Sequence, residues 1–276
     1  TLASTGDVSL NSSGTTGNAV VNNTTTALGL AASTIGGTLT AETDNSITVN
    51  GTVTSAGTTS VSASDDVVFA AAGALASGNG NITVTADDDN TPAGAGGALT
   101  MADGSTINSG TGTITLSADE DVALGGLTTT NGTATAVAIT SDSGSITDAG
   151  DTNVEITAST VGAVVTLSAK DIIGAVSGDA VYLDTSDTGY AGNPLETAIL
   201  SLSATTSASS GSEIAIDNTS ASGLALTTLQ PGGAANVGSV WMRNSAALDV
   251  SGITINNTNF PGDQLAFIAT TGNLTV

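Results

Sequence analysis

The sequence contains no cysteine and no histidine, and only two of its 276 residues are basic. Without these side chains the protein has no disulfide, no thiolate nucleophile, no imidazole base and no zinc site of the usual nitrogen and sulfur type. The two basic residues face 25 acidic ones, which gives a net charge of −23. A chain this acidic is repelled by phosphate backbones, so we expect no nucleic-acid partner.

Aromatic residues are also scarce, at 2% of the chain, so a conventional globular core would lack its largest members. No apolar run approaches the roughly 18–20 residues of a membrane-spanning helix, so we expect no membrane insertion. No segment carries the apolar stripe and caps of an amphipathic helix, which predicts little or no helix. Low aromatic content can accompany disorder, but 39% of the residues are hydrophobic and their order is regular.

That order is an alternation of aliphatic residues with mostly polar ones, chiefly Thr and Ser, over short runs. Period-two alternation with β-branched residues is typical of strands that bury one face. In each run the two outer residues should point inward and the middle residue outward. The clearest runs are residues 39–41, 47–49, 82–84, 114–116, 154–156, 165–167, 214–216 and 253–255.

Longer stretches of the sequence repeat as well. Residues 80–89 and 112–121 share a Gly, an Ile-Thr-aliphatic-Thr/Ser-Ala strand and an acidic triplet. If Leu39, Val61, Ile82 and Ile114 each begin a copy, the first two intervals are nearly equal and the third is longer by about half a coil. The long interval contains residues 90–97, a Pro- and Gly-rich stretch that predicts a loop.

The first two intervals give a period of roughly 21 residues, which suits one coil of a parallel β-helix with three short strands joined by turns. Coils stack about 4.8 Å apart and share their stability with their neighbours. We therefore predict an all-β protein, in which residues 1–276 form one continuous β-solenoid of about 21 residues per coil with loop insertions. Residues 4–10 and 271–276 both read as the opening of a repeat, so we expect a longer chain that is cut at both ends.

The amino-acid sequence of residues 80–87 and 96–118 resembles the repeats of filamentous-haemagglutinin-type large exoproteins and giant adhesins of Gram-negative bacteria. The resemblance covers about residues 36–175. It implies a right-handed parallel β-helix that is secreted or displayed at the cell surface, outside the outer membrane. It also implies a structural stalk whose partners are neighbouring coils and host-cell, polysaccharide or like-protein surfaces.

Acidic clusters are the main candidates for a binding site. They fall at the same corner of successive copies, where like charges about 5 Å apart repel and Ca²⁺ with oxygen ligands would relieve the repulsion. The alternative is a solvated acidic edge that aids solubility, and the glycine-rich nonapeptide of calcium β-rolls is absent. The candidate ligands are Asp65, Asp66, Asp87, Asp88, Asp89, Asp119, Glu120 and Asp121.

Two regions, residues 176–198 and 228–247, depart from the repeat and contain Tyr182, Tyr190 and Trp241. They are interpreted either as loops that cover the core or as a partner-binding surface. Three aromatic side chains exposed together would indicate carbohydrate binding, and scattered or buried ones would favour a stalk.

Paired carboxylates can also hydrolyse polysaccharides, as β-helical enzymes do. Such sites usually add His, Lys, Arg or aromatic sugar platforms, and this chain has very few of them. We therefore predict no enzymatic activity and assign no catalytic residue.

Overall fold

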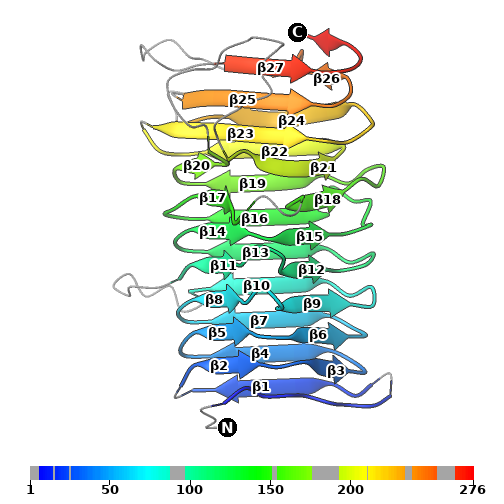
Figure 1. Ribbon diagram of the computed structural model, residues 1–276, viewed down its shortest axis with the longest axis vertical. Helices are drawn as coiled ribbons and strands as arrows, with labels where there is room; N and C mark the ends of the chain where they lie inside the picture. The colour runs from blue at the N-terminus through cyan, green and yellow to red at the C-terminus, as the bar shows by residue number, and fades with distance from the viewer. Residues whose placement is uncertain are drawn as a thin grey trace.

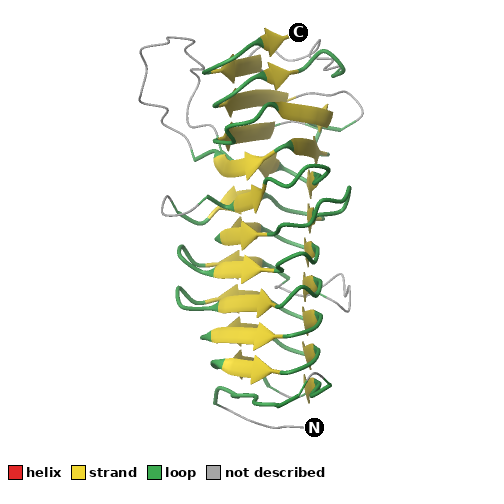
Figure 2. Ribbon diagram, turned by 90° about the vertical axis from the view of Figure 1, so that its right-hand side faces the viewer, coloured by secondary structure: helices red, strands yellow, loops and turns green. Residues whose placement is uncertain are grey.

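The computed structural model describes residues 6–14, 16–24, 26–87, 97–150, 154–175, 193–209, 211–233, 238–253 and 265–276. Over these ranges the chain forms 28 strands and no helix, so none of them contains a helix that could span a membrane. The strands stack into a β-solenoid of about 9 turns, with the first and last coils at opposite ends (Figures 1 and 2). The predicted fold is confirmed, although a turn averages about 24 residues, somewhat more than the sequence suggested.

The solenoid is built from parallel ladders of strands that lie across its long axis (Figure 2). The first ladder consists of β1 (Ala19–Asn23), β4 (Leu39–Thr43), β7 (Thr59–Ala63), β10 (Ile82–Ala86), β13 (Ile114–Ala118), β16 (Val137–Ser141), β19 (Val165–Ala169), β22 (Ser201–Thr206), β24 (Leu224–Gln230), β26 (Leu248–Asp249) and β28 (Leu274–Thr275).

The second sheet begins as two ladders of shorter strands that meet at a corner. One ladder contains β2 (Leu28–Leu30), β5 (Ile47–Val49), β8 (Val67–Phe69), β11 (Leu99–Met101), β14 (Val122–Leu124), β17 (Ile146–Asp148) and β20 (Ile172–Ile173). The other contains β3 (Ser33–Ile35), β6 (Thr52–Ser55), β9 (Ala74–Ser77), β12 (Thr106–Asn108), β15 (Gly126–Thr128), β18 (Ile156–Ala158) and β21 (Leu195–Ile199).

These two short-strand ladders merge above β20 and β21. Ile173 of β20 pairs with Ile214, and Leu195 of β21 pairs with Ile216, so both strands lie against the same long strand. From there on, β23 (Ser212–Asn218), β25 (Gly238–Asn244) and β27 (Leu265–Ala269) each replace two short strands (Figure 1). A coil with three strands thus becomes a coil with two.

The core is a set of columns in which each apolar side chain stacks on the one from the coil below. One column runs through Leu30, Val49, Phe69, Met101 and Leu124, and all five side chains are fully buried. The alternation in the sequence therefore identified the inward face. Aliphatic side chains make up almost all of this buried core, which agrees with the low aromatic content of the chain.

The register differs from the sequence prediction at one coil. Thr59, not Val61, lies opposite Leu39 and Ile82. Val61 is the second inward residue of its strand, so taking it as the first was wrong. Thr59 is 3% exposed, and its hydroxyl pairs with the Ser55 hydroxyl at 2.7 Å. A Thr at an inward position hid the true start of this repeat.

Insertions account for most of the difference between the predicted turn of about 21 residues and the observed average of about 24. The first coils are short, and Ala19 pairs with Leu39 without any inserted loop between them. The coil that runs from Ile82 to its partner Ile114 is longer, as the sequence predicted. The predicted loop at residues 90–97 lies outside the described residues except for Gly97. The coil from Val165 to its partner Leu202 is longer still.

Glycines stack at the turn that leads into the first ladder. A methyl group on Gly80 would lie 2.3 Å from the carbonyl carbon and oxygen of Gly57, and one on Gly112 would lie 2.2 Å from the Gly80 oxygen. Backbone atoms cannot move aside as a flexible side chain can, so neighbouring coils approach this closely only where no Cβ is present.

We expect the Gly80→Ala variant to be less stable than the wild type by about 1–3 kcal/mol, because the backbone must shift to admit the methyl group. Gly252→Ala is the matched control, since a methyl group there meets no atom of the described residues within 4 Å. Urea unfolding followed by circular dichroism measures both variants. Equal midpoints for the two variants would contradict the close packing of the glycine stack.

Candidate functional site

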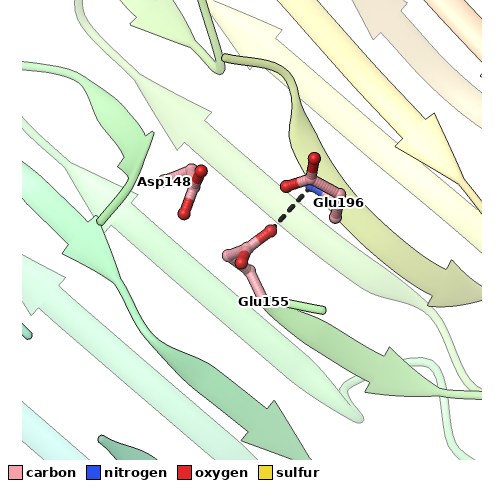
Figure 3. Close-up of side chains that lie close together, drawn as sticks. All are labelled: Asp148, Glu155 and Glu196. Carbon is pink, nitrogen blue, oxygen red and sulfur yellow. Dashed lines mark hydrogen bonds between the residues drawn. The ribbon is translucent and has the colours of Figure 1, made fainter. Parts of the chain in front are cut away.

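Three acidic side chains lie together on the side of the solenoid where the two short-strand ladders meet. Asp148 ends β17, Glu155 directly precedes β18, and Glu196 is the second residue of β21. Each contributes a carboxylate oxygen, and these oxygens lie within 4.8 Å of one another (Figure 3). This group, the carboxylate cluster, is the candidate site in the described part of the chain.

Asp148 occupies an interior position that aliphatic residues hold in the lower coils. It pairs with Leu124 and so continues the buried column that contains Phe69 and Met101. The Asp148 side chain is 7% exposed, and its Oδ1 accepts a hydrogen bond from the Gly150 amide at 2.7 Å. An acid in an apolar column is costly unless a partner compensates for its burial.

Glu155 and Glu196 face each other from adjacent strands. The Glu155 side chain is fully buried, and its Oε2 accepts a hydrogen bond from the Glu196 amide at 2.8 Å (Figure 3). The Glu155 amide in turn donates to the Glu196 carbonyl at 3.1 Å. These hydrogen bonds hold the Glu155 side chain against the backbone of Glu196.

The alternation in residues 154–156 predicted Val154 inward and Glu155 outward, and this was wrong. Val154 is 37% exposed, whereas Glu155 is 0% exposed. The strand begins only at Ile156, so both residues belong to the corner, where the period-two rule for strands does not hold.

The surroundings make the cluster hold protons tightly. Burial first, then the adjacent carboxyl group of Glu196 and the charges of Asp148 and Glu196, raise the pKa of Glu155 from 4.5 to about 10, against the lowering effect of a backbone hydrogen bond. Burial also raises the pKa of Glu196, against the opposing effect of its hydrogen bond with Glu155. Glu155 therefore holds its proton at neutral pH unless a cation replaces that proton.

Both basic residues of the chain are engaged elsewhere or exposed. Arg243 Nε donates a hydrogen bond to Asp217 Oδ1 at 2.8 Å, and Arg243 Nη2 forms a salt bridge with Asp217 Oδ2. The hydrogen bonding with Asp217 raises the pKa of Arg243. Asp217 pairs with both Glu196 and Arg243 along the ladder. Lys170 is exposed. In the described structure, no basic side chain forms an ion pair with Glu155 or Glu196.

The predicted calcium ligands lie at the acidic corner that follows the first ladder. Asp66 Oδ1 accepts hydrogen bonds from the amides of Gly97 and Ala98, at 3.0 and 3.1 Å. Asp121 Oδ1 accepts one from the Ser145 amide at 2.8 Å. These two carboxylates therefore bond the backbone of the next coil, which is a structural role.

The other acidic residues of this corner are placed as follows. The Asp87 amide donates to the Asp65 carbonyl at 3.2 Å, and the Ser143 hydroxyl lies 3.4 Å from Asp119 Oδ2. Glu120 is exposed, and Asp88 and Asp89 lie outside the described residues. Among described residues, no three of these acids meet as closely as the carboxylate cluster does. Calcium binding at the corner stays a prediction.

Trp241 points away from the coil interior on β25 and is 4% exposed. The Arg243 guanidinium lies 5.7 Å from the centre of its ring. Residues 238–244 form a ladder strand, so interpreting that part of residues 228–247 as a loop was wrong. Tyr182 and Tyr190 lie outside the described residues, and a shared aromatic surface stays a prediction.

The arrangement of the cluster limits its chemistry. A glycosidase needs a carboxylic acid that meets the substrate and has a pKa near the working pH. Glu155 is fully buried and its pKa is about 10, so it does not meet either requirement in this arrangement. Buried acidic oxygens that converge on one point can instead hold a proton or a hard cation.

The carboxylate cluster was not among the sites predicted from the sequence. The signal was an acid at an inward strand position, Ile146-Thr147-Asp148, together with a Glu just before one later strand and a Glu within another. Comparisons with protein-family models, with curated proteins and with solved structures each find no match for this chain.

Proposed function

We propose that this chain is a stalk segment of a large secreted or cell-surface bacterial adhesin, a stiff acidic rod that holds adhesive elements away from the cell. The observation that carries the proposal is the first ladder, an unbroken series of 11 parallel strands from β1 to β28. A spacer must keep a fixed length. The hydrogen bonds between successive strands of this ladder fix the length of the solenoid.

Physical features of the coils support this role. Each inner coil is hydrogen-bonded to the coils on either side and buries its aliphatic side chains against them. Stability in such a stack is shared between neighbours, so the rod has no single weak domain boundary. A net charge of −23 also opposes lateral association between rods.

Proteolysis tests the rod. Subtilisin, which cuts unfolded chains with little sequence preference, should leave the coils intact and cut only in loops, because stacked strands expose few cleavable segments. Peptide mapping by mass spectrometry locates the cuts. Digestion of the whole chain at the rate of its urea-unfolded form would contradict the proposal.

Two further measurements test whether the chain lies at the cell surface and whether it binds no ligand of its own. Antibodies raised against the chain should label intact cells of the source bacterium, and the isolated chain should bind no polysaccharide on a glycan array. Labelling only after cell lysis would contradict the surface location. Saturable binding to one polysaccharide would instead favour a carbohydrate-binding module.

A further inference from the structure

We propose that Asp148, Glu155 and Glu196 bind one divalent cation of the size of Ca²⁺, which ties together the strands below the point where the two short-strand ladders merge. The three residues come from β17, from the corner just before β18 and from β21 (Figure 3). The inference concerns a site within the rod and goes beyond the stalk function.

The spacing of the oxygens fits calcium. One oxygen of each side chain lies within 4.8 Å of the other two. Ca²⁺ binds oxygens at about 2.3–2.6 Å, so two ligands on opposite sides of the ion are about 4.6–5.2 Å apart. One ion therefore reaches all three carboxylates. The limit of 4.8 Å also admits the shorter spacing of about 4.2 Å between opposite Mg²⁺ ligands, but Mg²⁺ demands a regular octahedron, whereas Ca²⁺ accepts irregular sites.

A second observation comes from one oxygen of Glu155. This side chain is 0% exposed, and no described N–H or O–H group donates a hydrogen bond to its Oε1. Its other oxygen, Oε2, is already bonded to the Glu196 amide. Buried carboxylate oxygens without a partner are rare because their burial is costly, and a cation supplies the partner that Oε1 lacks.

Within the described part of the chain no basic side chain forms an ion pair with Glu155 or Glu196, and only the charge of Arg243 acts on Glu196 from beyond contact distance. Arg243 forms its salt bridge with Asp217, and Lys170 is exposed. Glu196 Oε2 is also buried without a hydrogen-bond partner among the described residues. A divalent ion that displaces the proton of Glu155 would compensate for the burial of Glu155 and Glu196 by binding their carboxylate oxygens.

The bound ion would act as a cross-link. Glu155 and Glu196 are 41 residues apart in the sequence but adjacent in the ladder. The segment between them contains most of the longest interval between paired strands of the first ladder, from Val165 to Leu202. A metal bound by residues this far apart in sequence would cross-link neighbouring coils and would make the stability of the rod depend on calcium.

Calorimetry and thermal unfolding test the site. The chain is dialysed against EDTA and then against metal-free buffer, and is titrated with CaCl₂. We expect one binding event per chain, and a rise in Tm of at least about 4 °C at millimolar Ca²⁺. NaCl at the same ionic strength should raise Tm less, because it only screens the charge. The absence of binding heat together with an unchanged Tm would overturn the proposal.

Substitutions locate the site. Glu155→Gln keeps the size of the side chain but removes its charge, and we expect it to weaken Ca²⁺ binding at least about tenfold. Glu196→Gln should do the same and serves if the first variant does not fold. Glu120→Gln is the matched control, because Glu120 is an exposed acid at the acidic corner. Wild-type affinity in a folded Glu155→Gln or Glu196→Gln variant would overturn the proposal, and so would loss of binding in Glu120→Gln alone.

Discussion

The Phe69→Ala variant is expected to be less stable than the wild type by about 3–5 kcal/mol, the usual cost of emptying a well-packed aromatic site. Phe69 is 0% exposed and lies in its column between Val49 below and Met101 above. The hydrogen-bonded strands hold the coils at a fixed spacing, so the neighbouring side chains cannot move together to fill the cavity. Urea unfolding followed by far-ultraviolet circular dichroism measures the loss.

Val68→Ala is the matched control for this experiment. Val68 is adjacent on the same strand but is only half-buried and points outward, so its truncation should cost less than about 1 kcal/mol. Trp241, the only tryptophan, reports on coils near the other end of the stack. If coupling passes only between neighbours, its fluorescence transition should shift less than the circular dichroism transition. A Phe69→Ala variant as stable as Val68→Ala would contradict the column model of the core.

In EDTA, the free energy of unfolding should fall by roughly 2–4 kcal/mol between about pH 6 and pH 9 because of Glu155. Folding raises the pKa of Glu155 from 4.5 to about 10. Its proton therefore stabilises the folded state fully below pH 4.5, and this contribution is lost as the pH rises toward 10. The upper limit is about 1.4 kcal/mol per pH unit for one proton.

Apart from Glu196, whose pKa is also raised, few groups of this chain titrate in this pH window. The chain has no His and no Cys, and ordinary carboxyl groups are already ionised at about pH 6. The groups that face Glu155 are Asp148 and Glu196, and Glu196 lies beside the pair of Asp217 and Arg243.

Thermal and urea unfolding across this range should show a slope for the wild type and none for Glu155→Gln. The α-amino group titrates equally in both proteins, so it cancels in the comparison. Parallel curves for the two proteins would show that Glu155 does not hold the proton.

Much of the fold followed from local pattern. Runs such as residues 82–84 and 114–116 carry aliphatic residues at every inward position, and the structure places them in one column set. Where a polar residue takes an inward position, as Thr59 does, the pattern loses its register. The change from three strands per coil to two had no signal in the period, because β23 reads in sequence like any other alternating run.

The carboxylate cluster was out of reach of the same reasoning for a physical reason. Asp148 and Glu155 meet at a corner of one coil. Glu196 follows Glu155 by 41 residues and joins them only because its coil stacks on theirs. Acidic clusters drew attention because their charge is concentrated in sequence. Their carboxylates Asp66 and Asp121 instead bond the backbone of the next coil. Acidic residues that are close together in the sequence therefore need not be the ones whose carboxylates meet in the structure.

The most direct test of the rod is the distance between two coils. Thr40 and Ser203 lie in one outward column of the first ladder, six strand steps apart. The chain has no Cys, so in a Thr40→Cys, Ser203→Cys double variant spin labels attach only at these two positions. Pulsed electron paramagnetic resonance then measures the distance between the two labels. A stiff stack predicts one narrow distribution near about 29 Å, from about 4.8 Å per step. A broad distribution, or one centred far from this distance, would contradict a stiff, continuous solenoid.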